Sequence, residues 1–132
     1  MCMYIPRITS LMVPKPELAK EDIPCFKVVR RDKVGDLYSV VLDFPYELHN
    51  VYTNESLETP TEGNIYFTVS KGFHSYASDK AVYEHYNRYY NNKNFEKVQC
   101  HIPKGSLYYV GEDYYGYPQY VSQSIVLDKM IL

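Results

Sequence analysis

The residues of this chain with the clearest chemical potential are tyrosines near its carboxyl end. Six of them fall within thirteen positions: Tyr108, Tyr109, Tyr114, Tyr115, Tyr117 and Tyr120. Gly111, Gly116 and Pro118 interrupt this run, which predicts a loop in which so many rings cannot share one core. Stacking a base or another planar ligand on such a ring stabilises a complex by about 1–3 kcal/mol. The run predicts a binding surface for a planar ligand; the competing interpretation is a small cluster of rings packed over a loop.

Four basic residues are candidates for pairing with a phosphate on such a ligand. They are Arg30, Arg31, Lys71 and Lys104. Guanidinium and ammonium groups form charge-assisted hydrogen bonds with phosphate oxygens. If these groups converge with the tyrosines, we expect a nucleotide-like small molecule as the partner, with an arginine at the end of the first core strand in contact with it.

The spacing of side chains does not support other kinds of reactive site. The histidines are scattered and form no HxH or HxxxH pair, and no CxxC pair occurs, so we expect no metal and no cofactor. Cys100 is predicted to face inward as a small apolar residue, and Cys25 to be exposed, with neither marked as a nucleophile. Glycine-rich phosphate loops and paired carboxylates are also missing from the sequence. We therefore expect binding without catalysis, and no catalytic residue.

Length and composition limit the partners and the compartment. At 132 residues the chain has room for one domain with one sizeable core. A net charge of −2, with both signs mixed along the chain, gives no electrostatic footprint for duplex nucleic acid or for an anionic membrane. No apolar run approaches the roughly 18 residues of a membrane helix, and the amino terminus lacks the pattern of a secretory signal. We expect a cytoplasmic protein with free thiols, and self-association stays open.

The scaffold that must position these residues is predicted to be a single α+β domain, a mostly antiparallel sheet with one principal helix packed on it. Residues 1–24 carry four prolines and are predicted to form an irregular arm, with a short edge strand and one helical turn over Glu17 to Lys20. Residues 26–132 form the core. β-Branched and aromatic runs predict strands at 26–30, 38–42, 65–69, 72–76, 98–102 and 125–127, with the last two paired.

Two further segments complete this scaffold. Residues 45–64 mix proline, glycine and polar residues, which predicts a long surface loop with a short strand near 49–52. Ser78 is a good N-cap and Asp79 has a charge that favours the first turn, so a helix is predicted from Ser78 to about Tyr90.

Three motifs resemble those of ADP-ribosyltransferase-like domains and occur in the same order. They are an arginine that ends an early strand, the segment Lys71-Gly72-Phe73-His74-Ser75-Tyr76-Ala77-Ser78, and the segment Ile102-Pro103-Lys104-Gly105-Ser106-Leu107-Tyr108-Tyr109 before the closing Ile125-Val126-Leu127. The resemblance implies that Arg30 or Arg31 holds a dinucleotide. It also implies that Gly72, Phe73 and Ser75, with His74 between them, help to shape a nicotinamide pocket.

The catalytic position of that family has no counterpart in this chain. Where the family places Glu-x-Glu before an apolar strand, the chain has Ser122-Gln123-Ser124, which cannot stabilise an oxocarbenium-like centre as a carboxylate does. The resemblance therefore implies a domain without transfer chemistry.

The GFHSY and IPKG motifs also resemble those of small proteins from phages and gut bacteria. We therefore hypothesise a non-catalytic binding module that sequesters a nucleotide-derived ligand, of a phage counter-defence type. One alternative is an ADP-ribosyltransferase-like enzyme with Glu112 or Asp113 as its acid. Another is a protein–protein interaction domain that uses the tyrosine run, because tyrosine is enriched at interface hot spots.

Overall fold

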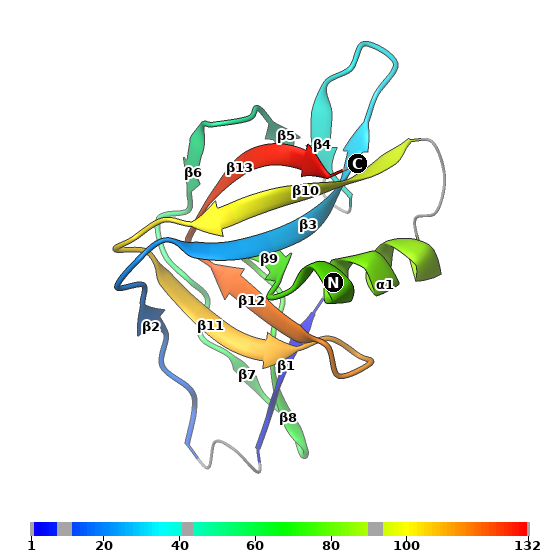
Figure 1. Cartoon of the computed structure of the whole chain (residues 1–132). Helices are drawn as coiled ribbons and strands as arrows, with labels where there is room; N and C mark the ends of the chain where they lie inside the picture. The colour runs from blue at the N-terminus through cyan, green and yellow to red at the C-terminus, as the bar shows by residue number, and fades with distance from the viewer. Residues whose placement is uncertain (1, 8–11, 41–43, 90–93, 132) are drawn as a thin grey trace.

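The computed structural model describes residues 2–7, 12–40, 44–89 and 94–131 (Figure 1). The strands are β1 Met3–Pro6, β2 Glu17–Leu18, β3 Ile23–Arg31, β4 Leu37–Ser39, β5 Pro45–Tyr46, β6 Val51–Thr53, β7 Thr61–Glu62, β8 Tyr66–Val69, β9 Phe73–Tyr76, β10 Phe95–Ile102, β11 Leu107–Glu112, β12 Pro118–Ser122 and β13 Ser124–Ile131. The one helix of the described residues is α1, Asp79–Tyr89. The protein is thus a mostly antiparallel sheet with one helix, and it is dominated by the sheet more strongly than predicted.

The strands form one continuous sheet in which all pairings are antiparallel. Its order is β6-β13-β10-β3-β9-β12-β11-β1-β8-β7, with β2 paired to β11, β4 to β3, and β5 to β4. β10 pairs with β13, so the predicted pairing of the strand at 98–102 with the final apolar run is confirmed. β3 and β9 are joined at a single residue pair, Phe26 with Tyr76. This junction separates an upper half, β6 to β3 with β4 and β5, from a lower half, β9 to β7 (Figure 1).

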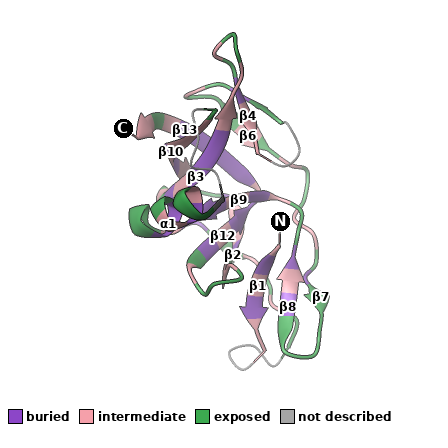
Figure 2. Cartoon of the chain, turned by 90° about the vertical axis from the view of Figure 1, so that its right-hand side faces the viewer, coloured by how far each residue is buried: buried purple, intermediate pink, exposed green. Residues whose placement is uncertain are grey.

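Two apolar clusters fill the sheet, one mainly in each half, and Phe73 of β9 joins the upper one. The upper cluster gathers inward residues of β3, β10 and β13, among them Val29, Cys100 and Ile125. The lower cluster gathers residues of β1, β8 and β12, among them Phe67 and Val121. These residues lie at alternate positions of their strands, as period-two patterning requires, and Figure 2 shows them as buried segments. The inward position predicted for Cys100 is confirmed, since it is 1% exposed.

Helix α1 packs on the sheet next to the junction of the two halves. The Ser78 hydroxyl accepts a hydrogen bond from the backbone N–H of Ala81 at 3.1 Å, which is the predicted N-cap. Ala81 and Val82 are buried against Val28 and Tyr76, whereas the outer face of the helix is exposed (Figure 2). The predicted helix is confirmed, and its predicted end at residue 90 lies outside the described residues.

The amino-terminal arm is more regular than predicted. β1 lies between β11 and β8, so it is not an edge strand, and Met3 and Ile5 on its inner face are buried. The helical turn predicted over Glu17 to Lys20 is wrong, because Glu17–Leu18 forms β2 and pairs with β11. Hydrogen bonding to an available strand edge outweighs the weak local preference that a preceding proline gives to a helix.

The tyrosine run is a β-hairpin, so the predicted loop over residues 108–120 is wrong. β11 and β12 pair from Tyr108 with Ser122 to Glu112 with Pro118. Gly116 has a φ of 87° and supplies the left-handed position of the turn. Gly111 lies inside β11, where a Cβ would be 2.5 Å from the carbonyl oxygen of Tyr4. That glycine marks the close approach of β1 and does not break the strand.

Three smaller predictions need comment. The strand predicted at 38–42 is β4, Leu37–Ser39; Val40 lies beyond its end, and predicted residues 41 and 42 lie outside the described residues. The loop predicted at 45–64 contains β5, β6 and β7, with the strand predicted near 49–52 found at Val51–Thr53. The predicted exposure of Cys25 is wrong: it is fully buried, because β3 begins before Pro24 and directs Cys25 inward beside Val29. No helix of the described residues is long and apolar enough to span a bilayer.

Candidate functional site

The sheet contains a fork at the middle of β3. One edge of β3 pairs with β9 at Phe26 and with β4 at Val29, Arg30 and Arg31. Lys27 and Val28, between these pairings, have no strand partner on this edge, so β4 and β9 diverge there. A cavity of about 780 Å³ opens at this fork. It is lined by Lys27, Val28, Ser39, Val40, Phe44, Tyr46, Asn54, Glu55, Ser56, Ser70, Lys71, Gly72, Phe73, His74, Tyr76, His85 and Gln119.

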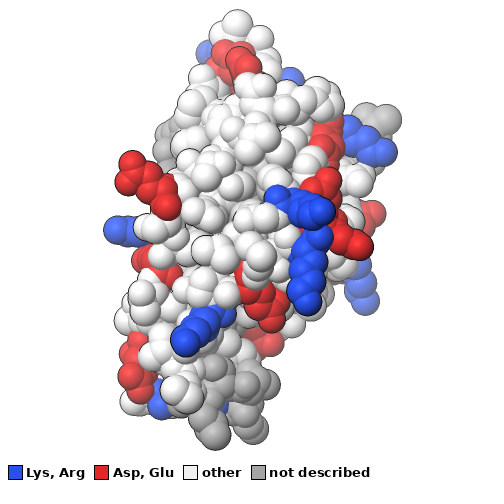
Figure 3. Space-filling view, turned by 90° about the vertical axis from the view of Figure 1, so that its left-hand side faces the viewer, with Lys and Arg blue, Asp and Glu red and all other residues white. Residues whose placement is uncertain are grey.

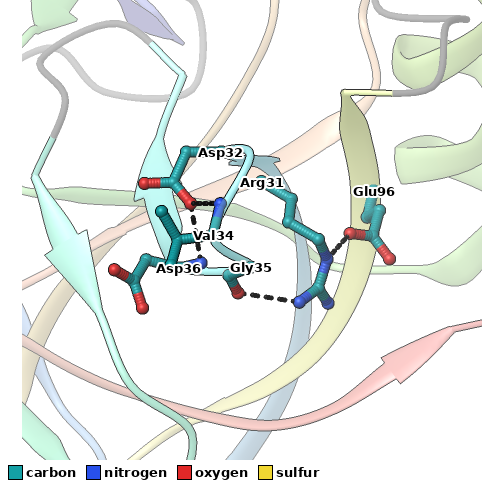
Figure 4. Close-up of polar contacts among 6 residues, drawn as sticks. All are labelled: Arg31, Asp32, Val34, Gly35, Asp36 and Glu96. Atoms are coloured by element: carbon teal, nitrogen blue, oxygen red, sulfur yellow. Dashed lines mark hydrogen bonds and ion pairs between the residues drawn. The ribbon is translucent and has the colours of Figure 1, made fainter.

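The β3–β4 turn fixes the upper arm of this fork. Figure 4 shows the Asp32 carboxylate accepting hydrogen bonds from the backbone N–H groups of Val34, at 3.0 Å, and Asp36, at 2.9 Å. Gly35 adopts a φ of 96° in the same turn. An aspartate that caps its own turn and a glycine in a left-handed conformation are the residues that such a turn requires. The turn sends β4 back along β3 for only three residues, which leaves the edge at Lys27 open.

Gly72 fixes the lower arm of the fork. Its φ is 125°, and a Cβ at this position would lie 2.5 Å from Cγ1 of Val121. Only glycine combines this backbone conformation with such close packing. Gly72 thus lets β9 start directly beside β12 and directs Phe73 and His74 to opposite faces of the strand.

Aromatic rings form the largest apolar wall of the cavity. Phe44 lies with its ring centroid 5.1 Å from that of Tyr46 and 5.7 Å from that of Phe73. Tyr52 closes the group behind them, at 5.3 Å from Tyr46 and 5.4 Å from Phe44. The contacts are tilted or edge-to-face, so the rings hold one another at fixed angles without stacking flat. We call Phe44, Tyr46 and Phe73 the aromatic wall.

Lys27 is the buried cation of the cavity. It is 9% exposed, and its Nζ donates a hydrogen bond of 2.6 Å to the carbonyl oxygen of His74. The same Nζ lies 5.6 Å from the ring centroid of Tyr46. The side chain therefore spans the fork from β3 to β9, next to the aromatic wall. A second cation, Lys71, is exposed and lines the cavity from the turn before β9.

Two histidines in the lining are held in the neutral form. Burial lowers the pKa of His74 to about 4 and that of His85 to about 4. Neutral His74 donates from Nε2 to the carbonyl oxygen of Ser70 at 2.8 Å, which leaves Nδ1 as a buried acceptor with no partner among the described residues. The His85 ring lies 4.9 Å from the ring of Tyr76, whose hydroxyl donates to Asp113 at 2.8 Å. His74 thus ties β9 to the turn before it, and His85 packs α1 against β9.

A carboxylate latches the loop that forms one side of the cavity. Residues 54–56 contribute to the lining, and Glu58 follows them. The Glu58 carboxylate accepts hydrogen bonds from the backbone N–H and hydroxyl of Ser70 and from the N–H of Lys71 at 3.0 Å. Partial burial acts to raise the pKa of Glu58, but these hydrogen bonds outweigh it and lower the pKa below its usual value. The charged latch holds the 54–58 loop against the turn before β9.

The structure brings four of the predicted site residues to the cavity. Lys71, Gly72, Phe73 and His74 line it. Ser75 shares the face of β9 that carries Phe73, but it is buried next to Cys25 and does not line the cavity. The GFHSY motif therefore contributes to the cavity through alternate faces of one short strand and through the turn before it.

The other predicted basic residues lie elsewhere. The Arg30 guanidinium lies 4.9 Å from the ring centroid of Tyr38. Arg31 pairs with Glu96 and donates to the carbonyl oxygen of Gly35 at 2.8 Å, as Figure 4 shows. Lys104 is exposed in the turn before β11. The predicted convergence of these groups with the tyrosines is not observed. On the face shown in Figure 3, basic and acidic residues are interspersed around an uncharged centre.

The six late tyrosines lie away from the fork cavity, on the β11–β12 hairpin. None of them lines the fork cavity. Tyr108 and Tyr120 pair edge-to-face at 5.9 Å on adjacent strands, and Tyr109 is buried in the lower cluster. Tyr117 packs beside α1, whereas Tyr114, 79% exposed, and Tyr115 lie at the hairpin tip. Alternation along β11 and β12 sends neighbouring rings to opposite faces. A stacking role for these rings stays a prediction.

Sequence reasoning missed Lys27, Phe44 and Tyr46. The available signal was the phase of the first core strand, where Lys27 shares a face with Cys25 and Val29. A lysine at an inward strand position is unusual, because burying a charge is costly.

Among residues 2–7, 12–40, 44–89 and 94–131, no group of three histidine, cysteine, aspartate or glutamate side chains is placed to hold a metal ion. Comparison of the chain with protein-family models, curated proteins and solved structures finds no match.

Proposed function

We propose that this protein binds a small, flat-ringed ligand in the fork cavity without transforming it. The observation that carries the proposal is the cavity itself, about 780 Å³ in volume, with an aromatic wall and a buried ammonium group at Lys27. Ligand sites in proteins are typically concave, about 300–1,000 Å³ in volume, mostly apolar, and supplied with a few placed polar groups. A nucleotide-like molecule has the flat ring and the acidic group that such a lining favours.

The chemistry of the lining supports binding over catalysis. Glu55 is its one carboxylate among the described residues, and Glu55 is exposed. His74 has a pKa of about 4 and its Nε2 donates to a backbone carbonyl, so it is poorly suited to exchange protons near neutral pH. Binding without turnover in the cytoplasm would sequester a nucleotide-derived signal, the phage counter-defence role hypothesised from the sequence.

Calorimetric titration of the purified protein with adenine mononucleotides, adenine dinucleotides and cyclic nucleotides tests this proposal. Phe44→Ala removes one ring of the aromatic wall from a side chain that is already 37% exposed, so the fold should tolerate it. We expect Phe44→Ala to weaken binding by about tenfold, the loss of one stacked ring. Tyr114→Ala, which removes a ring far more exposed, is the matched control and should leave affinity unchanged. No heat signal across the panel, or loss of binding only in Tyr114→Ala, would refute the proposal.

An ADP-ribosyltransferase-like enzyme is the second candidate, favoured by the position of Phe73 and His74 in the cavity lining. Its test is the release of nicotinamide from NAD. Release above an enzyme-free control that is abolished by Phe73→Ala but kept by Tyr114→Ala would favour the enzyme over the binding module.

A further inference from the structure

We propose that the ligand of the fork cavity carries a single negative charge, which Lys27 binds, next to a flat ring on the aromatic wall. The inference rests on the proposed function and adds the chemical class of the ligand, a planar ring that bears one monoanionic group such as a phosphodiester or a carboxylate.

Lys27 is a buried cation that has no counter-ion among the described residues. None of the ion pairs between described residues involves it. Its one hydrogen bond goes to a neutral carbonyl oxygen, that of His74. An ammonium has three N–H donors, so two stay available for a ligand. Because a buried charge is stable only when it is paired and hydrogen-bonded, an anion on the ligand would supply the partner that the described residues do not.

The lining of the cavity contains few charged side chains. Its formally charged members among the described residues are Lys27, Lys71 and Glu55. Lys71 and Glu55 are exposed, so solvent screens their charges. Their opposite charges also sum to zero. His74 and His85 are neutral. One buried positive charge remains, and it matches one negative charge. A ligand with several phosphate charges would leave the others buried and unpaired.

The charge of Lys27 lies close to the aromatic wall. Lys27 Nζ lies 5.6 Å from the ring centroid of Tyr46, and Tyr46 lies 5.1 Å from Phe44 and 6.5 Å from Phe73. An anion on Lys27 therefore reaches the aromatic wall within the length of one small molecule. The geometry selects a compact ligand in which the acidic group and the ring are close neighbours.

The test titrates the purified protein with two series of matched compounds. The phosphate series is adenosine, the phosphodiester 3′,5′-cyclic AMP, AMP and ATP. The carboxylate series is indole and indole-3-acetate. We expect at least one monoanion to bind about tenfold or more tightly than its neutral parent, and AMP and ATP to bind no more tightly than cyclic AMP. Which series responds identifies the source of the anion.

Two variants assign the charge to a residue. Lys27→Met should abolish the preference for the monoanion while the neutral parent still binds, and Lys27→Arg should restore part of it. Lys104→Met, which removes an exposed cation outside the cavity, should leave the preference within about twofold. Thermal melts followed by circular dichroism confirm that each variant is folded.

The outcomes separate this inference from the proposed function. Equal binding of the neutral parents and the monoanions, or tighter binding of ATP, would leave a ligand cavity but overturn the single-charge assignment. A preference for the monoanion that survives in Lys27→Met would overturn the role of Lys27. No binding in either series would overturn the proposed function and this inference with it.

Discussion

The fork between β4 and β9 and the hairpin of β11 and β12 are both rich in aromatic residues, but they use them differently. In the hairpin the rings of adjacent strands meet in pairs, such as Tyr108 with Tyr120, and fill the space between them. At the fork the rings of Phe44, Tyr46 and Phe73 come from two separate segments, residues 44–46 and β9, and line a cavity. Aromatic density alone therefore does not locate a site; a site requires a place where backbone pairing stops.

The largest test of this comparison removes one ring from each region. Phe73→Ala should reduce the free energy of unfolding by about 3 kcal/mol, because Phe73 is 6% exposed and belongs to the upper cluster. Tyr114→Ala should change it by less than about 0.5 kcal/mol, since the ring is 79% exposed. Urea unfolding followed by circular dichroism measures both. Equal losses would show that the two regions are packed alike and would break the comparison.

Two glycine substitutions compare the backbone packing of the fork with that of the hairpin. Gly72→Ala should cost about 2–4 kcal/mol, because the new methyl group meets Val121 and the φ of 125° is unfavourable for alanine. Gly116→Ala in the hairpin turn should cost only about 1 kcal/mol, since a Cβ there has open space and only the φ of 87° is strained. The same unfolding assay applies. If Gly116→Ala proved the more harmful, the close packing assigned to the fork would be wrong.

The contribution of the fork to stability should depend on pH, whereas that of the hairpin should not. The pKa values of His74 and His85 are lowered to about 4 from an ordinary value near 6.5, so the unfolded chain binds protons that the folded protein does not. Stability is therefore complete above about pH 6.5 and falls as the pH drops toward 4. The slope should reach about 1.4 kcal/mol per pH unit for each histidine.

Single variants show how much each histidine contributes to this pH dependence of stability. His74→Gln and His85→Gln should each remove about half of it, and Tyr114→Ala should leave it unchanged. Unfolding curves at several pH values between 4.5 and 7 provide the measurement. A slope that neither histidine variant reduces would contradict the neutral, buried imidazoles at the fork.

The smallest expected effect concerns the latch on the 54–58 loop. Glu58→Gln keeps an acceptor but loses the charge that strengthens three hydrogen bonds, so a loss of about 1 kcal/mol is expected at neutral pH. The wild-type advantage is present above the ordinary carboxyl pKa and disappears as the pH falls through the lowered pKa of Glu58. Glu62→Gln, which removes the exposed pair with Arg7, is the control and should change stability by less than about 0.5 kcal/mol.

The sequence predicted those elements whose signal is local. Alternation from Val98 to Ile102 predicted β10, and the Ser78 cap predicted the start of α1. The hairpin was missed because Gly111 reads as a loop residue, although its role is to admit β1, a strand more than one hundred positions away in sequence. The contact that explains this glycine is non-local, so no window of sequence around it contains the information.

The cavity was only partly predictable for the same reason. Lys71, Phe73 and His74 were identified through their motif, but the gap beside Lys27 exists because β4 and β9 compete for one edge of β3 and neither covers it fully. Which strands share an edge, and where each stops, depends on pairing across the whole chain. Arg31 failed as a candidate because its partner, Glu96, is supplied by β10.

The single residue pair between Phe26 and Tyr76 is the one strand pairing that joins β3 of the upper half to β9 of the lower half. A molecule bound in the cavity as proposed would contact β3 and β4 on one side and β9 on the other. It would couple the unfolding of the two halves, so we expect a sharper unfolding transition with such a ligand than without it.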